Sequence, residues 1–383
     1  HTAVKINPEY KNAVVHVNDA SRAVTVVGDL LNKETAHEYV AKMKKDYDEF
    51  SEKFLRRKKS KSYVTISQAR QNKLKINWET AAISKPKEMG IQILKQLSLK
   101  ELEPFLDWSP FFRSWDLHGK FPDILTDDIV GEQASQLYAD AKVMMERIIA
   151  KQYLKPRGIF GLFEANTVND DDISIQKNGK EIAVFRTLRQ QLKKREGAVH
   201  RALSDYIAPK ETGLSDYMGA FCVAIFGVDE LAESYKKKED DYSAIMVQAI
   251  ADRFAEAFAE YLHKQVRSKH WAYAEDEALT NNELIKEVYK GIRPAPGYPS
   301  CPDHLEKETI WDLLKVKEGI GVKLTESLAM WPAAAVSGYY FANPEARYFG
   351  LGKISDDQVT DYANRKGIEK EKANKWLFPN LAE

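Results

Sequence analysis

The chain has 383 residues, of which 44% are hydrophobic and 30% are charged. This composition excludes a largely disordered protein and provides enough apolar residues for two or three domains. Lys+Arg and Asp+Glu both total 57, so no net charge attracts nucleic acid or an acidic membrane.

Residues 1–57 are predicted to form a short connector of extended and helical segments. Two β-like runs, at residues 13–17 and 22–27, precede a helix whose apolar residues from Tyr39 to Phe54 recur at three- and four-residue steps. A basic run at residues 56–61 then marks a linker, although it also suits phosphate or partner binding. The chain starts at His1 without an initiator methionine, so we interpret it as a fragment of a longer protein.

Residues 58–383 are predicted to form an α+β domain around an antiparallel sheet. Helices are expected at residues 129–152 and 243–268, and strands at residues 158–168 and 217–226. The strongest local signal is a hairpin at residues 173–185. There Asn178-Gly179 separates two β-rich runs, and both residues tolerate positive φ. Strands in hairpins with helices inserted between them are typical of this fold class.

The C-terminal part is predicted to alternate between helices and strands. Residues 280–283 have the form of a capping box that begins a helix ending near Gly291, and residues 355–358 begin a second helix ending at Gly367. Strands are expected at residues 324–330, 335–341 and 347–354. The most apolar segment, residues 327–342, is shorter than a membrane span and is interrupted by Pro332, so it predicts a buried strand and no membrane partner.

Several common site signatures are missing from the sequence. It contains no G-x-G-x-x-G, no Walker motif, no H-E-x-x-H and no G-x-S-x-G, which argues against a Rossmann-type methyltransferase and predicts no catalytic or metal-binding residue. Cys222 and Cys301 are too few for a disulfide framework and are wrongly spaced for zinc. Together with the lack of a signal peptide, they favour the cytoplasm.

The most unusual segment is a loop at residues 291–302 that contains four prolines. Prolines fix the backbone, and Gly297 permits a geometry or close approach that a side chain would block. Such a loop would hold Arg293 and Tyr298 in a fixed relation, and a guanidinium can bind a carboxylate through two parallel hydrogen bonds. The alternative is a structural loop in which Arg293 caps the C-terminus of a helix.

Three further places suit a zwitterionic ligand that carries an aromatic ring. Asp107 is a carboxylate among aromatic residues, or else it starts a helix. The pair Tyr348-Phe349 could stack on an adenine, or else it belongs to an ordinary core strand. Glu256 lies between apolar neighbours on the helix at residues 243–268, where a solvent-facing position is the alternative.

Taken together, several segments resemble the C-terminal activation domain of cobalamin-dependent methionine synthase. They are LDWSPFF at residues 106–112, GKFP at 119–122, PRGIFGLF at 156–163, AEAFAE at 255–260, RPAPGYP at 293–299, LTESLAMWP at 324–332 and DYANRKG at 361–367. The loop at residues 293–299 is the most specific of these. Residues 1–6 and 19–26 are similar to the end of the family's cobalamin-binding region, whose D-x-H-x-x-G fingerprint this chain lacks, so it is not expected to hold cobalamin alone.

The resemblance implies a role in reactivating methionine synthase, a methyltransferase of methionine biosynthesis. In this family the domain presents S-adenosylmethionine to the oxidised cobalamin while flavodoxin supplies an electron. By the family's pattern Arg293 would bind the carboxylate of S-adenosylmethionine, Asp107 a donor group and Tyr348-Phe349 the nucleoside. The backbone around Ala295 and Gly297 would line the site, Tyr298 would face the cobalamin, and Glu256 is a further candidate.

Two alternatives remain at this stage. One is a docking module for the cobalamin domain and flavodoxin that has no ligand site of its own. The other is an independent methyltransferase, for which the sequence offers no recognisable base or nucleophile.

Overall fold

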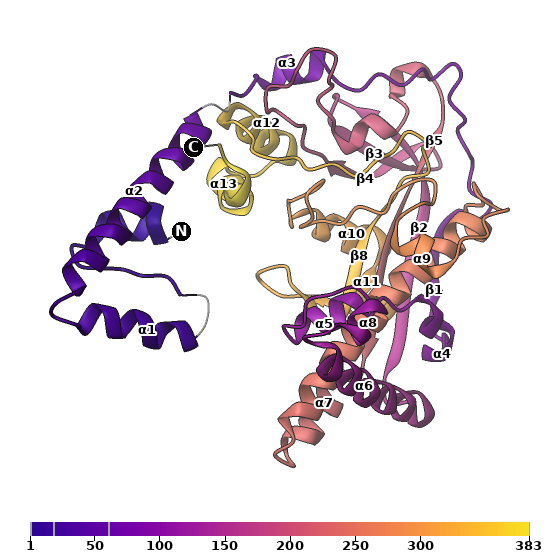
Figure 1. Ribbon diagram of the computed structural model, residues 1–383. Coiled ribbons are helices and arrows are strands. Elements are labelled where there is room, and N and C mark those ends of the chain that lie inside the picture. The colour runs from indigo at the N-terminus through magenta and orange to yellow at the C-terminus, as the bar shows by residue number, and fades with distance from the viewer. Residues whose placement is uncertain (1, 18–19, 60–61, 383) are drawn as a thin grey trace. The chain divides into compact units, whose positions relative to one another are not determined.

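The computed structural model describes residues 2–17, 20–59 and 62–382, and the chain divides into two compact units, His1–Val64 and Thr65–Glu383 (Figure 1). The first unit contains helices α1 (Ala20–Leu31) and α2 (Ala36–Lys59), and α2 confirms the predicted amphipathic helix. The basic run continues α2 as far as Lys59, and residues 60–61 of that run lie outside the described residues.

The strands predicted for the first unit are wrong. Residues 22–27 belong to α1, and residues 13–17 have no regular secondary structure. Val24, Val27 and Leu31 recur at three- and four-residue steps and so share one face of α1. The described part of this unit holds no strand with which a β-branched run could pair, and helix periodicity prevails over β propensity.

The second unit is built on a six-stranded antiparallel sheet, which confirms the predicted α+β fold. The strand order is β4-β3-β2-β5-β8, and β1 pairs with β2 beside β3. The strands are β1 (Gly90–Leu94), β2 (Lys155–Val168), β3 (Asp172–Lys177), β4 (Lys180–Arg186), β5 (Asp216–Phe226) and β8 (Ala335–Tyr340). The predicted hairpin is confirmed, with Asn178 and Gly179 both at positive φ between β3 and β4.

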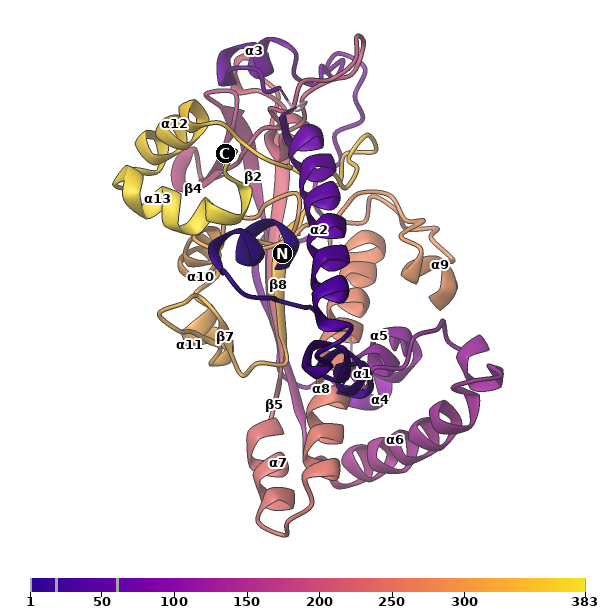
Figure 2. The same cartoon turned by 60° about the vertical axis from the view of Figure 1, so that its left-hand side comes forward.

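Helices cover both faces of this sheet because successive side chains of β2 and β5 point in opposite directions. On one face Phe160 and Phe221 pack with Phe254 of α8 (Asp241–Gln265), and on the other Ile159 and Cys222 pack in the same cluster as Leu314. Figure 2 shows α8 and α10 (Glu306–Leu314) on opposite sides of β8. The face of α8 is extended by α5 (Ser109–Ser114), α6 (Gly131–Lys151) and α7 (Val228–Lys236), and the face of α10 by α11 (Val316–Ile320).

The remaining elements are short and correct several predictions. They are α3 (Ile66–Gln71), α4 (Leu99–Leu102), α9 (Asn281–Ile285), β6 (Lys323–Leu324), β7 (Met330–Trp331), α12 (Asp356–Lys366) and α13 (Lys370–Leu377). The predicted strand at residues 324–330 is a small β6-β7 hairpin, and residues 347–354 form no strand.

The capping box of Thr280 and Glu283 forms, but its helix ends at Ile285 and not near Gly291. Ser355 makes no capping bond, while α12 does end at Gly367 with φ +69°.

A buried ion network holds the turn between β2 and β3. The fully buried guanidinium of Arg189 donates to Asp171 and Asp205, with Nε–Oδ1 and Nη2–Oδ1 distances of 2.7 Å. Arg70 of α3 binds the second oxygen of Asp171 at 2.7 Å. Within the described ranges, no helix is long and apolar enough to cross a membrane.

Candidate functional site

The proline-rich loop runs along the free side of β8. Ile292 and Phe341 exchange two backbone hydrogen bonds of 3.0 Å, and the N–H of Tyr339 donates to the carbonyl of Pro294 at 2.9 Å. This approach requires small residues in the strand, because a Cβ on Gly338 would lie 2.6 Å from the Pro294 oxygen. The loop therefore acts as an additional edge of the sheet, held by the backbone of β8.

A cavity of about 490 Å³ lies between this loop, α8 and the segment after residue 346. Six of the residues expected from the sequence line it: Glu256, Arg293, Ala295, Tyr298, Tyr348 and Phe349. The rest of the wall includes the ring of Phe221 from β5 and the carboxylate of Glu287. The structure thus brings together expected residues from Glu256 to Phe349, which are 349 − 256 = 93 positions apart in the sequence.

Arg293 is anchored at the floor of the cavity. Its Nη2 donates to Oε2 of Glu260 at 2.9 Å, so it pairs with a carboxylate and does not cap a helix. Its Nε is buried without a hydrogen-bond partner, and Nη1 has none among the described residues. Burial opposes the charge, but Glu260 and nearby tyrosines outweigh it and raise the pKa of the guanidinium. The cavity therefore contains a permanent cation with one terminal nitrogen free for an anionic ligand.

The pair Tyr348-Phe349 lies on a loop and not on the predicted strand. The Tyr348 hydroxyl accepts the backbone N–H of Arg293 at 2.9 Å, which joins this loop to the proline-rich one. The hydroxyl of Ser300 donates to the carbonyl of Phe349 at 2.7 Å and fixes the next residue. Burial raises the pKa of Tyr348, against the opposing effect of Arg293, so this side chain stays a neutral hydroxyl.

Gly297 and Tyr298 form the tip of the loop. Gly297 has φ +96°, and a Cβ there would meet the ring of His304 at 2.4 Å, so glycine is required as expected, although it does not line the cavity. Tyr298 is 58% exposed at the cavity edge. Partial desolvation of this side chain and the charge of Glu256 raise its pKa, against the opposing charges of Arg293 and Arg253.

Asp107 does not line the cavity. Its Oδ1 accepts the N–H of Ser109, the first residue of α5, at 2.9 Å, so it lies next to the start of the helix, although the N-cap position itself is Trp108. Its Oδ2 makes no hydrogen bond within the part of the chain that the structure describes. The neighbouring carbonyl of Leu106 accepts from Asn281 of α9 at 3.2 Å, so this segment is tied to the region that precedes the proline-rich loop.

Two carboxylates of the site were not singled out from the sequence. Glu260 follows Glu256 by four residues on α8, so both lie on one face of the helix, and it is buried where it binds Arg293. Its neighbours Ala259 and Tyr261 give no sequence signal that would mark it as a site residue. Glu287 has φ +55° just after α9, and no periodic pattern marks it.

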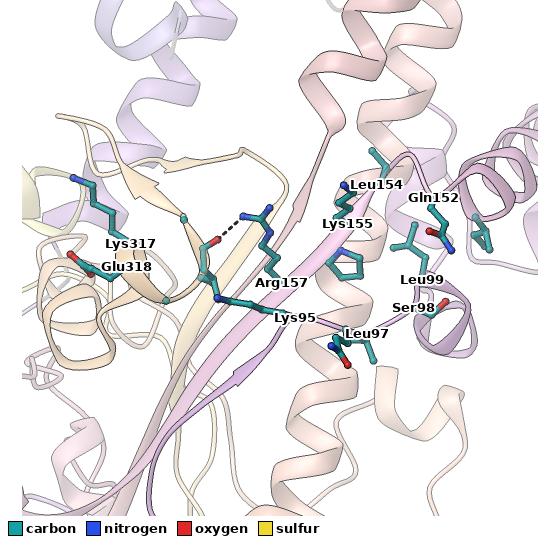
Figure 3. Close-up of a pocket in the computed structure, with 16 residues that line it drawn as sticks. Lys95, Leu97, Ser98, Leu99, Gln152, Leu154, Lys155, Arg157, Lys317 and Glu318 are labelled. Carbon is teal, nitrogen blue, oxygen red and sulfur yellow. Dashed lines mark hydrogen bonds between the residues drawn. The ribbon is translucent and has the colours of Figure 1, made fainter.

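A larger hollow of about 740 Å³ lies elsewhere, between the start of β2 and α11 (Figure 3). Its lining includes Lys95, Lys155 and Arg157 but none of the expected site residues. Figure 3 shows Arg157 reaching the backbone carbonyl of Ile320, a contact of 3.3 Å, while Lys317 points away from it. Arg157 is the one guanidinium in the lining of this hollow and already has a protein partner. We therefore assign the candidate ligand site to the smaller cavity. No cluster of His, Cys, Asp or Glu in the described ranges could hold a metal ion.

Comparison with known proteins identifies the family of this chain. Residues 98–367 match the family described as vitamin B12 dependent methionine synthase, activation domain. A crystal structure of the MetH reactivation domain bound to AdoHcy is similar, with a TM-score of 0.81 and 47% sequence identity over 84% of this chain and 99% of that chain. The matched region contains the whole lining of the cavity.

Proposed function

This chain belongs to the family of vitamin B12-dependent methionine synthase activation domains, and we propose that its 490 Å³ cavity binds S-adenosylmethionine for reactivation of the cobalamin. The observation that carries the proposal is the free Nη1 of Arg293 in a cavity that also contains two carboxylates and aromatic rings. The similar reactivation domain binds AdoHcy, which has the same amino-acid and nucleoside parts.

The charges of the cavity fit the charges of the ligand. S-adenosylmethionine carries a carboxylate, an ammonium and a sulfonium, and Arg293 is proposed to bind the first through Nη1, since Nη2 is taken by Glu260. Glu256 and Glu287 supply negative charge for the cationic groups, and Tyr348-Phe349 offer aromatic surface to the nucleoside. Asp107 is proposed to accept a hydrogen bond from the ligand through its free Oδ2. Bound S-adenosylmethionine supplies an already activated methyl group, so the residues need only position it.

The remaining parts of the proposal concern partners. We propose that the chain works within methionine synthase against the cobalamin-binding domain, receives electrons from flavodoxin or a similar donor, and is not catalytic alone. The exposed ring of Tyr298 is proposed to face the cobalamin. Residues 1–57 are proposed as the connector to the cobalamin-binding region, supported by the separate compact unit His1–Val64. The unpaired thiols of Cys222 and Cys301 support a cytoplasmic location.

Isothermal titration with S-adenosylmethionine tests this proposal. The wild-type chain is expected to bind one equivalent, and Arg293→Ala to weaken binding by at least about tenfold through loss of a charge-assisted hydrogen bond. Arg195→Ala is the matched control, because Arg195 is exposed and does not line the cavity. Equal affinity in the wild type and Arg293→Ala contradicts the carboxylate assignment, and no saturable heat with the wild type contradicts the proposed function.

A further inference from the structure

Glu260 lies beneath the cavity between two arginines. Its side chain is 10% exposed, and Oε2 accepts from Nη2 of Arg293 at 2.9 Å. Its other oxygen, Oε1, lies 3.7 Å from Nη1 of Arg267 and has no hydrogen-bond partner in the described part of the chain. The same carboxylate therefore serves two cations, one that faces the ligand cavity and one that does not.

Arg267 is held firmly in place. Its side chain is fully buried, and Nε and Nη2 donate to the carboxylate of Glu277 at 2.8 and 2.7 Å. Its guanidinium also lies 4.2 Å from the ring centre of Tyr289. These contacts fix the position of the positive charge behind Glu260, so the Glu260 carboxylate has a rigid neighbour against which to orient.

Helix α8 explains how this arrangement is reached. Glu256, Glu260 and His263 recur at four- and three-residue steps along one face, and Arg267 follows in the turn that continues the helix. Glu256 lines the cavity, and Glu260 lies one turn further along. The helix thus carries the ligand-facing residue and its support on one rigid element.

Sharing the carboxylate has a consequence for Arg293. A buried guanidinium without a partner is costly, so without Glu260 the side chain of Arg293 would leave its position for solvent. A carboxylate that belonged to Arg293 alone would instead neutralise it and weaken its attraction for a ligand anion. Because Arg267 takes part of the charge of Glu260, Arg293 is held by Nη2 while Nη1 keeps its attraction for an anion in the cavity.

We propose that Glu260, supported by Arg267, is a positioning residue that sets Arg293 for the carboxylate of the ligand. This inference rests on the proposed function and adds a selective effect. Disturbing Glu260 weakens ligands that carry the amino-acid carboxylate and spares those that lack it. A merely structural role would weaken both kinds equally.

The test compares two ligands by isothermal titration of the full 383-residue chain. S-adenosylmethionine carries the amino-acid part on a sulfonium, whereas 5′-methylthioadenosine keeps the nucleoside and a neutral thioether and lacks the amino-acid part. Glu260→Gln is expected to raise the Kd of S-adenosylmethionine about tenfold or more, because a charge-assisted hydrogen bond is lost. The Kd of 5′-methylthioadenosine is expected to stay within about twofold, the range of changes remote from a contact.

Three further variants make the outcome decisive. Glu233→Gln, an exposed glutamate of α7, is the matched control and should change neither Kd. In an Arg293→Ala background Glu260→Gln should have no further effect on S-adenosylmethionine, because the two residues act as a unit. If Glu260→Gln fails to fold, Glu260→Asp, which keeps the charge, is titrated in its place. The Kd of S-adenosylmethionine should then rise relative to that of 5′-methylthioadenosine.

The results that overturn the inference are distinct from those that overturn the proposed function. Equal weakening of both ligands, or no change in either, refutes the positioning role of Glu260. A wild-type chain that binds neither ligand refutes the proposed function itself.

Discussion

Replacing Gly338 by alanine is expected to separate the proline-rich loop from β8. The added Cβ would lie 2.6 Å from the carbonyl oxygen of Pro294 and 3.0 Å from the ring of Phe221, two residues that line the cavity. To reach the 3.4 Å of an ordinary contact, the loop must move by about 0.8 Å. The same movement stretches the 2.9 Å hydrogen bond between Tyr339 N–H and Pro294 to about 3.7 Å, beyond a useful length.

The expected cost follows from this geometry. Overpacking of a tight contact typically lowers the free energy of unfolding by about 1–3 kcal/mol. Because the displaced segment also positions Arg293, the Kd for S-adenosylmethionine should rise by about tenfold or more, which corresponds to about 1.4 kcal/mol.

Urea unfolding and isothermal titration of the same Gly338→Ala preparation measure both effects. The control is Ser337→Ala on the same strand, where the removed hydroxyl is buried and has no partner in the described part of the chain. The control should keep the wild-type Kd and should not lower stability. A Gly338→Ala chain with wild-type stability and affinity would refute the claim that the loop depends on this close approach.

Three other variants test separate parts of the structure. Burial raises the pKa of Asp216 to about 6, against backbone hydrogen bonds from Ala208 and Tyr217, so folding favours the protonated form of this carboxyl. The stability that Asp216 contributes is fully present below pH 3.8 and is lost as the pH rises through 6. Asp216→Asn should remove up to about 3 kcal/mol of that pH-dependent loss. Urea unfolding of both chains at pH 4 and 7.5 checks it, and the contrary result is an equal change in the free energy of unfolding between the two pH values in both chains. Arg189→Met leaves the buried Asp205 without a cationic partner and Asp171 with Arg70 alone, so it should lower the free energy of unfolding by about 3–5 kcal/mol. A loss below about 1 kcal/mol in urea would contradict the role of the network. Tyr348→Phe removes the acceptor of the Arg293 N–H and should raise the Kd for S-adenosylmethionine several-fold, by about 1 kcal/mol, in a titration where an unchanged Kd would show that the ring alone matters.

Local signals account for the parts of the fold that the sequence predicted well. The hairpin at Asn178-Gly179 depends on two residues that accept positive φ, and α8 depends on a long run with helical periodicity. The strand predicted at residues 22–27 was wrong. β-branched residues favour strands, but this run has no strand to pair with in the described part of its unit and forms part of α1. Residues 347–354 contain aromatic residues typical of a strand but are held by isolated contacts, such as the hydrogen bond from Leu351 to Pro299.

The candidate site was predictable only where residues of unusual type cluster in the sequence. Arg293, Tyr298 and the glycine between them stand in one short loop, and Tyr348-Phe349 stand out as an adjacent pair. Glu260 could not be chosen from the sequence. Its role depends on its contacts with Arg293, 33 positions away, and with Arg267, which only the fold brings together. Asp107 was chosen as a carboxylate among aromatic residues and then by resemblance, and in the structure it accepts a local hydrogen bond from the N–H of Ser109 two residues on.

A crystal structure of the chain with S-adenosylmethionine is the most direct test of the central claim. We expect the ligand in the 490 Å³ cavity, with its carboxylate within about 3.2 Å of Nη1 of Arg293 and the nucleoside against Tyr348. Ligand bound in the larger hollow near Arg157, or in the cavity with its carboxylate turned away from Arg293, would contradict the account.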